Sequence, residues 1–203
     1  HNALQINVAL KLSPKLAPEA FDASAVVNAA RLLAKVRHPR VVRIHGVDHV
    51  EGRAGIWMEL VRGQTLDGMV QAMPFTEREA IAIGIQLSQA LAAVHNENVL
   101  HGDIKAHNVI RRDNADVVIV DFGAGRTCAS TRPHGGDAGT LVYMAPEVLR
   151  GEVRSPASDV YSLGVLLFYM VTGRYPVWAD SIEAARDAHE QGRATRLREL
   201  RSD

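Results

Sequence analysis

Four polar residues lie close together in the middle of the chain, and their types suit one kind of chemistry. Asp103, Lys105 and Asn108 fall within the sequence His-Gly-Asp-Ile-Lys-Ala-His-Asn, and Asp121 follows eighteen residues after Asp103. A carboxylate can accept a proton from a hydroxyl group, and a lysine can neutralise a phosphate. Asparagine and aspartate supply the hard oxygen ligands that Mg²⁺ prefers. These residue types suit phosphoryl transfer from ATP, in which positioning and charge neutralisation supply most of the catalysis.

Further motifs occur in a fixed order around these residues. Val8-Ala9-Leu10-Lys11 comes first, Asp121 opens the tripeptide Asp-Phe-Gly, and Ala145-Pro146-Glu147 follows. Any one of these short motifs can arise by chance, but together they form an ordered set in consistent structural context. On these motifs the chain resembles bacterial serine/threonine protein kinases over nearly its whole length. The resemblance implies an α+β, two-lobed fold with a truncated β-rich N-lobe and a mainly α-helical C-lobe.

The resemblance also implies a role for each residue that matches a motif. Asp103 resembles the catalytic base, and Lys105 resembles the lysine that steadies the transferring phosphate in Ser/Thr-selective kinases. Asn108 and Asp121 resemble the two Mg²⁺ ligands, and Lys11 resembles the strand lysine that contacts the α- and β-phosphates.

The resemblance also predicts which residues would surround adenine. These are Ala9 and Ile110 on its two faces, Met58 as gatekeeper, and the backbone of Glu59 and Val61. The implied cofactors are ATP and Mg²⁺, and the implied partner is a protein with a Ser or Thr acceptor.

Other matching residues have supporting roles in the resemblance. Asp159 resembles the helix aspartate that anchors the backbone of the catalytic loop. Gly139-Thr140 resembles the element that abuts this loop and the acceptor residue. His101 and Glu147 are expected to be structural.

The elements that must position these residues follow from hydrophobic periodicity and punctuation. Strands are predicted at 6–10, 41–44 and 54–60, with a turn at 51–52, and shorter ones at 99–100, 109–110 and 117–120. A helix is predicted over 18–36, ending before Pro39. A capping box from Thr76 to Glu79 predicts a long helix with apolar residues at Ile81, Ile85, Leu87, Leu91 and Val94. Two more helices are predicted, from 155–156 to Thr172 with Gly173 as the stop, and over 182–191.

The lobe boundary is expected near Arg62-Gly63. Residues 1–62 would then form an N-lobe remnant and residues 63–203 the C-lobe of a single partial kinase domain. Only ten residues precede Lys11, and none of them forms a Gly-x-Gly-x-x-Gly loop, so we expect the hairpin over the ATP phosphates to be missing. Because the chain ends at Asp203, the family's last helices are expected to be missing as well.

Two substitutions depart from the family pattern inside the chain. Ala29 stands where a helix glutamate would pair with Lys11, and Gly102 stands where an arginine would precede the catalytic aspartate. That arginine would receive an activation-loop phosphate through charge-assisted hydrogen bonds. We therefore expect the loop that holds Thr127, Ser130 and Thr131 to act without phosphorylation.

Composition limits the other possibilities. The 203 residues are 47% hydrophobic and 23% charged with zero net charge, so neither nucleic acid nor an anionic membrane surface is an expected partner. Cys128 is the single cysteine, which excludes an internal disulfide and a cysteine zinc site and fits a cytoplasmic setting. The longest apolar run, 160–171, is too short to span a bilayer.

Three functions remain open. The first is ATP-dependent phosphorylation of Ser or Thr in proteins, with this fragment impaired. The second is a pseudokinase that acts as a binding or regulatory module, which Ala29 and the missing loop favour. The third is a small-molecule phosphotransferase resembling the aminoglycoside kinases, whose His-Gly-Asp sequence is followed by an asparagine five residues later. Those enzymes lack Ala-Pro-Glu and the Ser-Asp-x-Tyr-Ser-Leu-Gly helix that begins here at Ser158.

Overall fold

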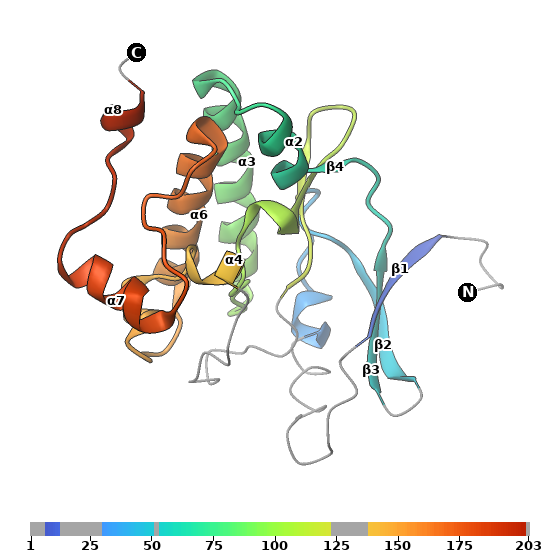
Figure 1. Cartoon of the computed structure of the whole chain (residues 1–203). Helices are drawn as coiled ribbons and strands as arrows, with labels where there is room; N and C mark the ends of the chain where they lie inside the picture. Colours follow the sequence, from blue (N-terminus) through green and yellow to red (C-terminus); the bar gives the residue numbers. More distant parts are fainter. Residues whose placement is uncertain (1–6, 13–29, 51–52, 123–137, 202–203) are drawn as a thin grey trace.

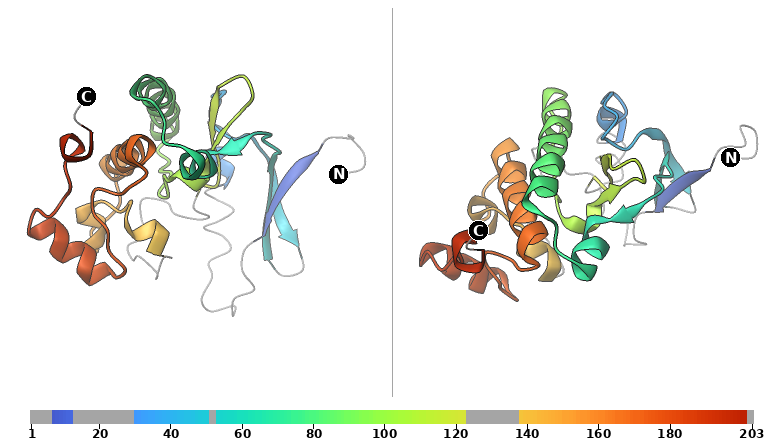
Figure 2. Two further views of the ribbon diagram at one scale, coloured as in Figure 1. Left: turned by 45° about the horizontal axis from the view of Figure 1, so that its top comes forward. Right: turned by 90° about the horizontal axis from the view of Figure 1, so that it is seen from above.

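The computed structural model of the chain describes residues 7–12, 30–50, 53–122 and 138–201. Its strands are β1 (Val8–Leu12), β2 (Ile44–Val50), β3 (Arg53–Glu59), β4 (Gln64–Thr65), β5 (Val109–Arg111) and β6 (Val117–Ile119). Its helices are α2 (Leu66–Ala72), α3 (Glu77–Asn96), the 3₁₀ turn η1 (Ala106–Asn108), α4 (Ala138–Leu141), α5 (Pro146–Leu149), α6 (Pro156–Thr172), α7 (Ile182–Glu190) and α8 (Leu197–Leu200). Figures 1 and 2 show a small sheet at one side of a larger helical part, which is the predicted two-lobed α+β arrangement.

The first sheet forms the smaller lobe. Its strands are antiparallel in the order β1-β3-β2, and the register places Ala9 opposite Met58 and Lys11 opposite Ile56. Ile56 is buried against Ala30, so residues 30–33, which are helical, cover one face of this sheet. The strand predicted over 54–60 is confirmed as β3, and the one predicted over 6–10 is shifted to Val8–Leu12 among the described residues.

The strand predicted over 41–44 is wrong. β2 begins only at Ile44, and Val41 instead forms an isolated parallel bridge with Ile119 of β6. The amide of Val42 donates to the Ile119 carbonyl at 3.0 Å, and the Ile119 amide donates to the Arg40 carbonyl at 2.9 Å. Tertiary pairing with the larger lobe therefore overrides the local strand preference of these β-branched residues.

The helix predicted over 18–36 falls largely outside the described residues. In the described part, the helix ends earlier than predicted, at residue 33 and not at residue 36. The amides of Lys35 and Val36 bond to the carbonyls three residues earlier, at 3.0 Å each, which tightens the last turn and ends the helix before Pro39. The turn predicted at 51–52 also lies outside the described residues.

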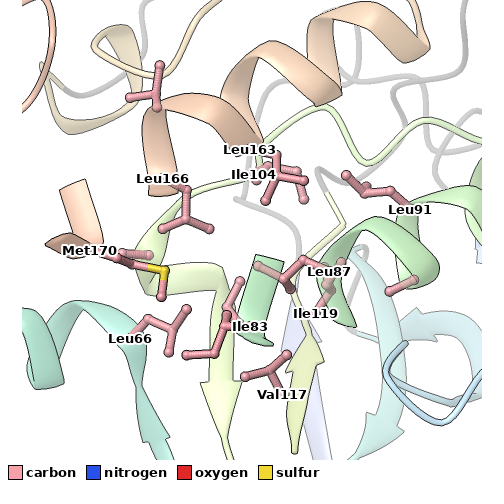
Figure 3. Close-up of a cluster of buried hydrophobic side chains, with 14 of the residues drawn as sticks. Leu66, Ile83, Leu87, Leu91, Ile104, Val117, Ile119, Leu163, Leu166 and Met170 are labelled. Atoms are coloured by element: carbon pink, nitrogen blue, oxygen red, sulfur yellow. The ribbon is translucent and has the colours of Figure 1, made fainter. Parts of the chain in front are cut away.

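The core of the larger lobe lies between α3 and α6 and the sheet β4-β5-β6 (Figure 3). The capping box is confirmed: the Thr76 hydroxyl accepts from the Glu79 amide at 3.4 Å, and the Glu79 carboxylate accepts from the Thr76 amide at 3.2 Å. Leu87, Leu91 and Val94 are buried as predicted. Ile81 and Ile85 are not, with exposed fractions of 63% and 56%, because Ile83 and Leu87 set the inward face and positions two residues away point outward.

The remaining predictions for this lobe are mixed. α6 begins with Pro156 and ends at Thr172 with Gly173 as its C-cap, as predicted. α7 matches its prediction closely, and β5 and β6 are confirmed. No strand forms at Val99-Leu100: both residues are buried in the core, and the Val99 amide donates to the Val94 carbonyl at the end of α3 at 3.3 Å. The short elements β4, α2, α4, α5 and α8 were not predicted, since none contains enough residues to show a period.

Candidate active site

The loop between α3 and β5 gathers three of the predicted site residues. Lys105 Nζ lies 2.9 Å from Asp103 Oδ2, and Asn108 Nδ2 donates to the same oxygen at 3.0 Å and to the Asp103 carbonyl at 2.8 Å. Among the described residues, Asp103 Oδ1 has no hydrogen-bond partner. Asn108 is buried, and its backbone amide donates to the Lys105 carbonyl at 2.9 Å. The 3₁₀ turn η1 thereby closes the loop around Asp103. The carboxylate is thus fixed by one of its oxygens and keeps the other for a ligand.

Asp159 of α6 holds the beginning of this loop. Its two carboxylate oxygens accept from the amides of His101 at 2.9 Å and Gly102 at 2.8 Å, and from His95 Nε2 at 2.9 Å. Burial alone would raise the pKa of Asp159, but these hydrogen bonds and the neighbouring histidines bring it below its usual range. The predicted contact of Asp159 with the loop backbone is therefore present in the structure.

His101 is completely buried and supports the same loop. Its Nε2 contacts the Val120 carbonyl at 3.1 Å, its Nδ1 accepts from the Asp103 amide at 3.2 Å, and its ring packs on Phe122 with centroids 4.5 Å apart. An Nδ1 that accepts a hydrogen bond carries no proton, so this network assigns the neutral Nε2–H tautomer. Burial lowers the pKa of His101, which favours the same neutral form.

Lys11 and Asp121 meet across the space between the lobes. The ammonium of Lys11, on β1, is in direct contact with Asp121 Oδ1. Burial lowers the pKa of Lys11, and the negative charge of Asp103 opposes this shift. Asp121 has a backbone φ of 59°, an uncommon conformation for a residue other than glycine. The strand lysine and the first residue of Asp-Phe-Gly therefore form a single charged pair.

A pocket of about 250 Å³ opens beside this pair. Its lining contains every residue that the sequence placed around adenine, together with both members of the pair. The lining residues are Ala9, Leu10, Lys11, Met58, Glu59, Leu60, Val61, Ile110, Val120 and Asp121. Apolar walls with a few polar groups at one end are typical of sites for small ligands.

The donor set fits Mg²⁺ with limited protein ligation. The part of the chain that the structure describes holds no group of three or more His, Cys, Asp or Glu side chains that could bind a metal by themselves. Mg²⁺ is usually bound by one or two protein oxygens together with phosphate and water. Asp121 would supply a carboxylate oxygen. Because Asn108 directs its Nδ2 to Asp103, its Oδ1 would be the second oxygen ligand.

Comparison with known families matches residues 1–201 to the protein kinase domain. The chain belongs to the protein kinase family. Its curated relatives include "Serine/threonine-protein kinase PknH" of Mycobacterium tuberculosis, 31% identical over 95% of this chain and 31% of the relative. "Serine/threonine-protein kinase PrkC" of Bacillus subtilis is 32% identical over 80% of this chain and 26% of its own length. "Sperm motility kinase Z" of Mus musculus is 33% identical over 82% of this chain and 34% of its own length. The chain spans about a quarter to a third of the curated relatives it matches.

In this kinase, α4 and the residues that follow it pack on the loop between α3 and β5. Lys105 Nζ donates to Thr140 Oγ1 at 3.0 Å, and the Ala106 amide lies 3.4 Å from the Tyr143 hydroxyl. Glu147 accepts from the Ser158 hydroxyl at 2.9 Å, which ties α5 to the first turn of α6. Thr140 therefore abuts the catalytic loop as predicted, and Glu147 has a structural contact.

The connection between the kinase lobes is fixed at both ends. The Glu59 amide donates to the Arg43 carbonyl at 2.9 Å, and the Glu59 carboxylate lies 2.5 Å from Arg112. Gly63 has a φ of 146°, and a Cβ atom there would lie 2.2 Å from the Arg111 carbonyl oxygen. A glycine is therefore required where the connection passes β5.

Some contacts had no signal in the sequence, and some predictions cannot be placed. Arg154, Tyr143 and Arg112 contact residues far away in the sequence and belong to none of the recognised motifs. Ala29 and the segment with Thr127, Cys128, Ser130 and Thr131 lie outside the described residues.

Within the described part of the chain, no helix has the length and apolar character needed to cross a membrane.

Proposed function

We propose that this chain is the catalytic part of a kinase that transfers the γ-phosphoryl group of ATP to Ser or Thr in proteins. The observation that carries the proposal is the arrangement of Asp103, Lys105 and Asn108 in one hydrogen-bonded cluster, with Lys11 and Asp121 beside an apolar pocket. Phosphoryl transfer requires these groups to be held in place more than it requires covalent chemistry from the protein.

Each residue has a role in this proposal. The apolar lining takes up adenine, and because the Glu59 amide is already bonded to Arg43, Glu59 contacts adenine through its carbonyl oxygen. Lys11 faces the phosphates, and Asn108 and Asp121 would hold Mg²⁺, which supplies charge neutralisation when it is bound. Asp103 Oδ1 orients the acceptor hydroxyl and takes up its proton. Lys105, held between Asp103 and Thr140, stabilises the negative charge on the phosphoryl group in transfer.

The reaction balances without a further reactant. The acceptor oxygen forms a bond to the γ-phosphorus, the bond from the γ-phosphorus to the β,γ-bridging oxygen breaks, and ADP leaves. A protein acceptor is supported by Thr140, which lies beside the proposed base because Lys105 contacts both Thr140 and Asp103. This contact argues against a small-molecule phosphotransferase.

The experiment compares Asp103→Asn and Asp121→Asn with the unaltered protein, using Mg·ATP and dephosphorylated casein. We expect each variant to lower kcat by about 10²- to 10⁴-fold, because a general base or a metal ligand is lost. Asp113→Asn, which alters an exposed aspartate in the β5–β6 turn, is the matched control and should keep full activity. Near-normal kcat for Asp103→Asn in a folded protein would refute the assignment.

A pseudokinase is the second candidate, and one contact favours it. Lys11 already neutralises Asp121, so a metal ion must compete with the protein's own cation. In that case the unaltered protein would bind ATP, would need no Mg²⁺ to do so, and would leave casein unlabelled. Magnesium-dependent binding together with transfer to casein would exclude this candidate.

A cytoplasmic setting for the protein stays a prediction that rests on the single cysteine.

A further inference from the structure

Gly102 is an unusual residue to find next to the proposed catalytic base. Its φ is 71°, in the left-handed region, and glycine restrains the peptide planes on its two sides less than any other residue. The plane that joins Gly102 to Asp103 contains the Gly102 carbonyl and the Asp103 amide, and it stays flat. Rotation of this one plane would therefore move the backbone from which the Asp103 side chain extends.

The structure holds this plane at both ends. The Asp103 amide donates to His101 Nδ1 at 3.2 Å. At the opposite end, Nη1 of Arg154 donates directly to the Gly102 carbonyl oxygen. The preceding plane is held by Asp159, which accepts from the Gly102 amide at 2.8 Å. Arg154 and Asp159 are five residues apart at the start of α6, so one segment holds the loop backbone on both sides of Gly102.

The site around Arg154 is partly closed to solvent. Nη2 of Arg154 is covered by protein atoms. A cavity of about 20 Å³, with room for a single water molecule, lies among residues that include Asp103, Thr140, Arg154 and Asp159. Arg154 therefore lines the same small cavity as two aspartates. A planar guanidinium is well suited to this position because it stays charged and directs its donors in fixed directions.

We propose that Arg154 is a positioning residue for Asp103, and that it supplies from another part of the chain the restraint that Gly102 does not provide. The inference rests on the proposed function, because it assigns Asp103 as the base. Arg154 contacts the loop through the Gly102 carbonyl, and so it acts on catalysis through the orientation of Asp103. Loss of the contact should leave the pocket for ATP unchanged, since neither Arg154 nor Gly102 lines that pocket.

The test compares Arg154→Met, which keeps much of the side-chain volume without a donor, with Arg154→Lys, which keeps one charged donor. Arg150→Met is the matched control, because Arg150 is an exposed arginine in the same loop and pairs only with the exposed Glu152 among the described residues. We expect Arg154→Met to lower kcat about 10- to 100-fold while KM for ATP changes less than about threefold, since small misplacements of a catalytic group cost this much. Arg154→Lys should recover part of kcat, and Arg150→Met should match the unaltered protein.

Hydrogen exchange gives a readout that does not depend on activity. In Arg154→Met the amides of His101, Gly102 and Asp103 should exchange at least about tenfold faster, while amides in the middle of α3 stay unchanged. Faster exchange at these three amides in a protein that never phosphorylates casein would mean that the proposed function fails and the positioning role stands. Unchanged exchange together with kcat within twofold of the unaltered protein would overturn the proposal. If Arg154→Met does not fold, Arg154→Lys and Arg154→Gln decide by the same exchange measurement, with protection as in the unaltered protein for Lys and reduced for Gln.

Discussion

Lys11 and Asp121 belong to different lobes, and their direct contact determines what the binding of Mg·ATP must change. The contact satisfies both charges in the absence of a ligand. If Asp121 holds Mg²⁺ as proposed, the metal has to share this carboxylate with the ammonium or displace it toward the phosphates. Ala29, at the position where the family pattern has a glutamate, provides no alternative carboxylate for Lys11.

A carboxylate at position 29 should relieve this competition. We expect Ala29→Glu to tighten the binding of Mg·ATP about two- to tenfold, equal to about 0.4–1.4 kcal/mol, because the new charge can hold Lys11 near the phosphates and release Asp121. Calorimetric titration measures the change. Asn28→Glu adds the same charge one position earlier, about 100° around the predicted helix, and should have no such effect. Equal affinities for Ala29→Glu and the unaltered chain would argue against Lys11 as a phosphate ligand.

His101 should make stability depend on pH. Burial lowers the pKa of His101 in the folded state, whereas in the unfolded chain its pKa is about 6.5. Between these two values the unfolded state binds more protons, so the free energy of unfolding falls as pH drops below about 6.5, by up to about 1.4 kcal/mol per pH unit. The lowered pKa of Asp159 acts elsewhere, since its stabilisation is present above about pH 4 and is lost below that.

The measurement is urea unfolding of the unaltered protein and of His101→Asn between pH 6.5 and 5. The asparagine keeps an acceptor for the Asp103 amide but does not titrate, so the variant should be less stable at pH 7 and show a shallower dependence on pH. His189, whose pKa is also lowered by burial, should leave part of the slope in place. Parallel curves for the two proteins would contradict a neutral, buried His101.

At the scale of elements, the long helices could be predicted because periodicity and caps agree. α3 has its capping box, and α6 has proline at its start and glycine at its end. Val41 and Val99 could not be placed correctly, because a few apolar residues in sequence do not show whether a neighbouring strand will pair with them.

Much of the site could be predicted, since Asp103, Lys105 and Asn108 lie within one loop. The contact of Arg154 could not, because its partner lies 52 residues away.

Gly63 gives the sharpest test at this scale. A Cβ atom at this position would lie 2.2 Å from the Arg111 carbonyl oxygen and 2.9 Å from the Ile110 side chain. We expect Gly63→Ala to lower the free energy of unfolding by about 2 kcal/mol or more and to weaken ATP binding, because the backbone must move next to Ile110 of the pocket. Gly151→Ala is the control: its φ is also positive, at 86°, but a Cβ there meets no atom within 4 Å. A similar loss of ATP binding in both variants would show that strain alone, and not the clash with β5, is responsible.

At the scale of the whole molecule, Gln86 of α3 joins the two lobes. Its side-chain oxygen accepts from Arg40 Nε at 2.9 Å and from the Val117 amide at 3.1 Å. Arg40 lies in the segment that leads to β2, and its guanidinium also lies 3.3 Å from Asp116. This segment is thereby fastened to the larger lobe.

Gln86→Leu should remove this connection. We expect the free energy of unfolding to fall by about 1–3 kcal/mol, because the partly buried Val117 amide loses its acceptor and Arg40 loses one of its partners. Gln64→Leu, at an exposed position in β4, should stay within about 0.5 kcal/mol of the unaltered protein. Urea unfolding at one pH measures both. An effect of equal size in the two variants would mean that Gln86 contributes no more than a surface residue.

The fastened segment near Val41 and the connection at Gly63 are the two places where the described chain crosses between the lobes. A line through them defines a pivot for the first sheet. Rotation of the first sheet about this pivot would change the separation of Lys11 and Asp121, because Lys11 belongs to the sheet and Asp121 to the larger lobe. It would leave Asp103, Lys105 and Asn108 in the same relative positions. If the proposed function holds, we expect nucleotide entry and departure to depend on movement of the sheet, and we expect the acceptor hydroxyl to meet residues whose arrangement that movement does not alter.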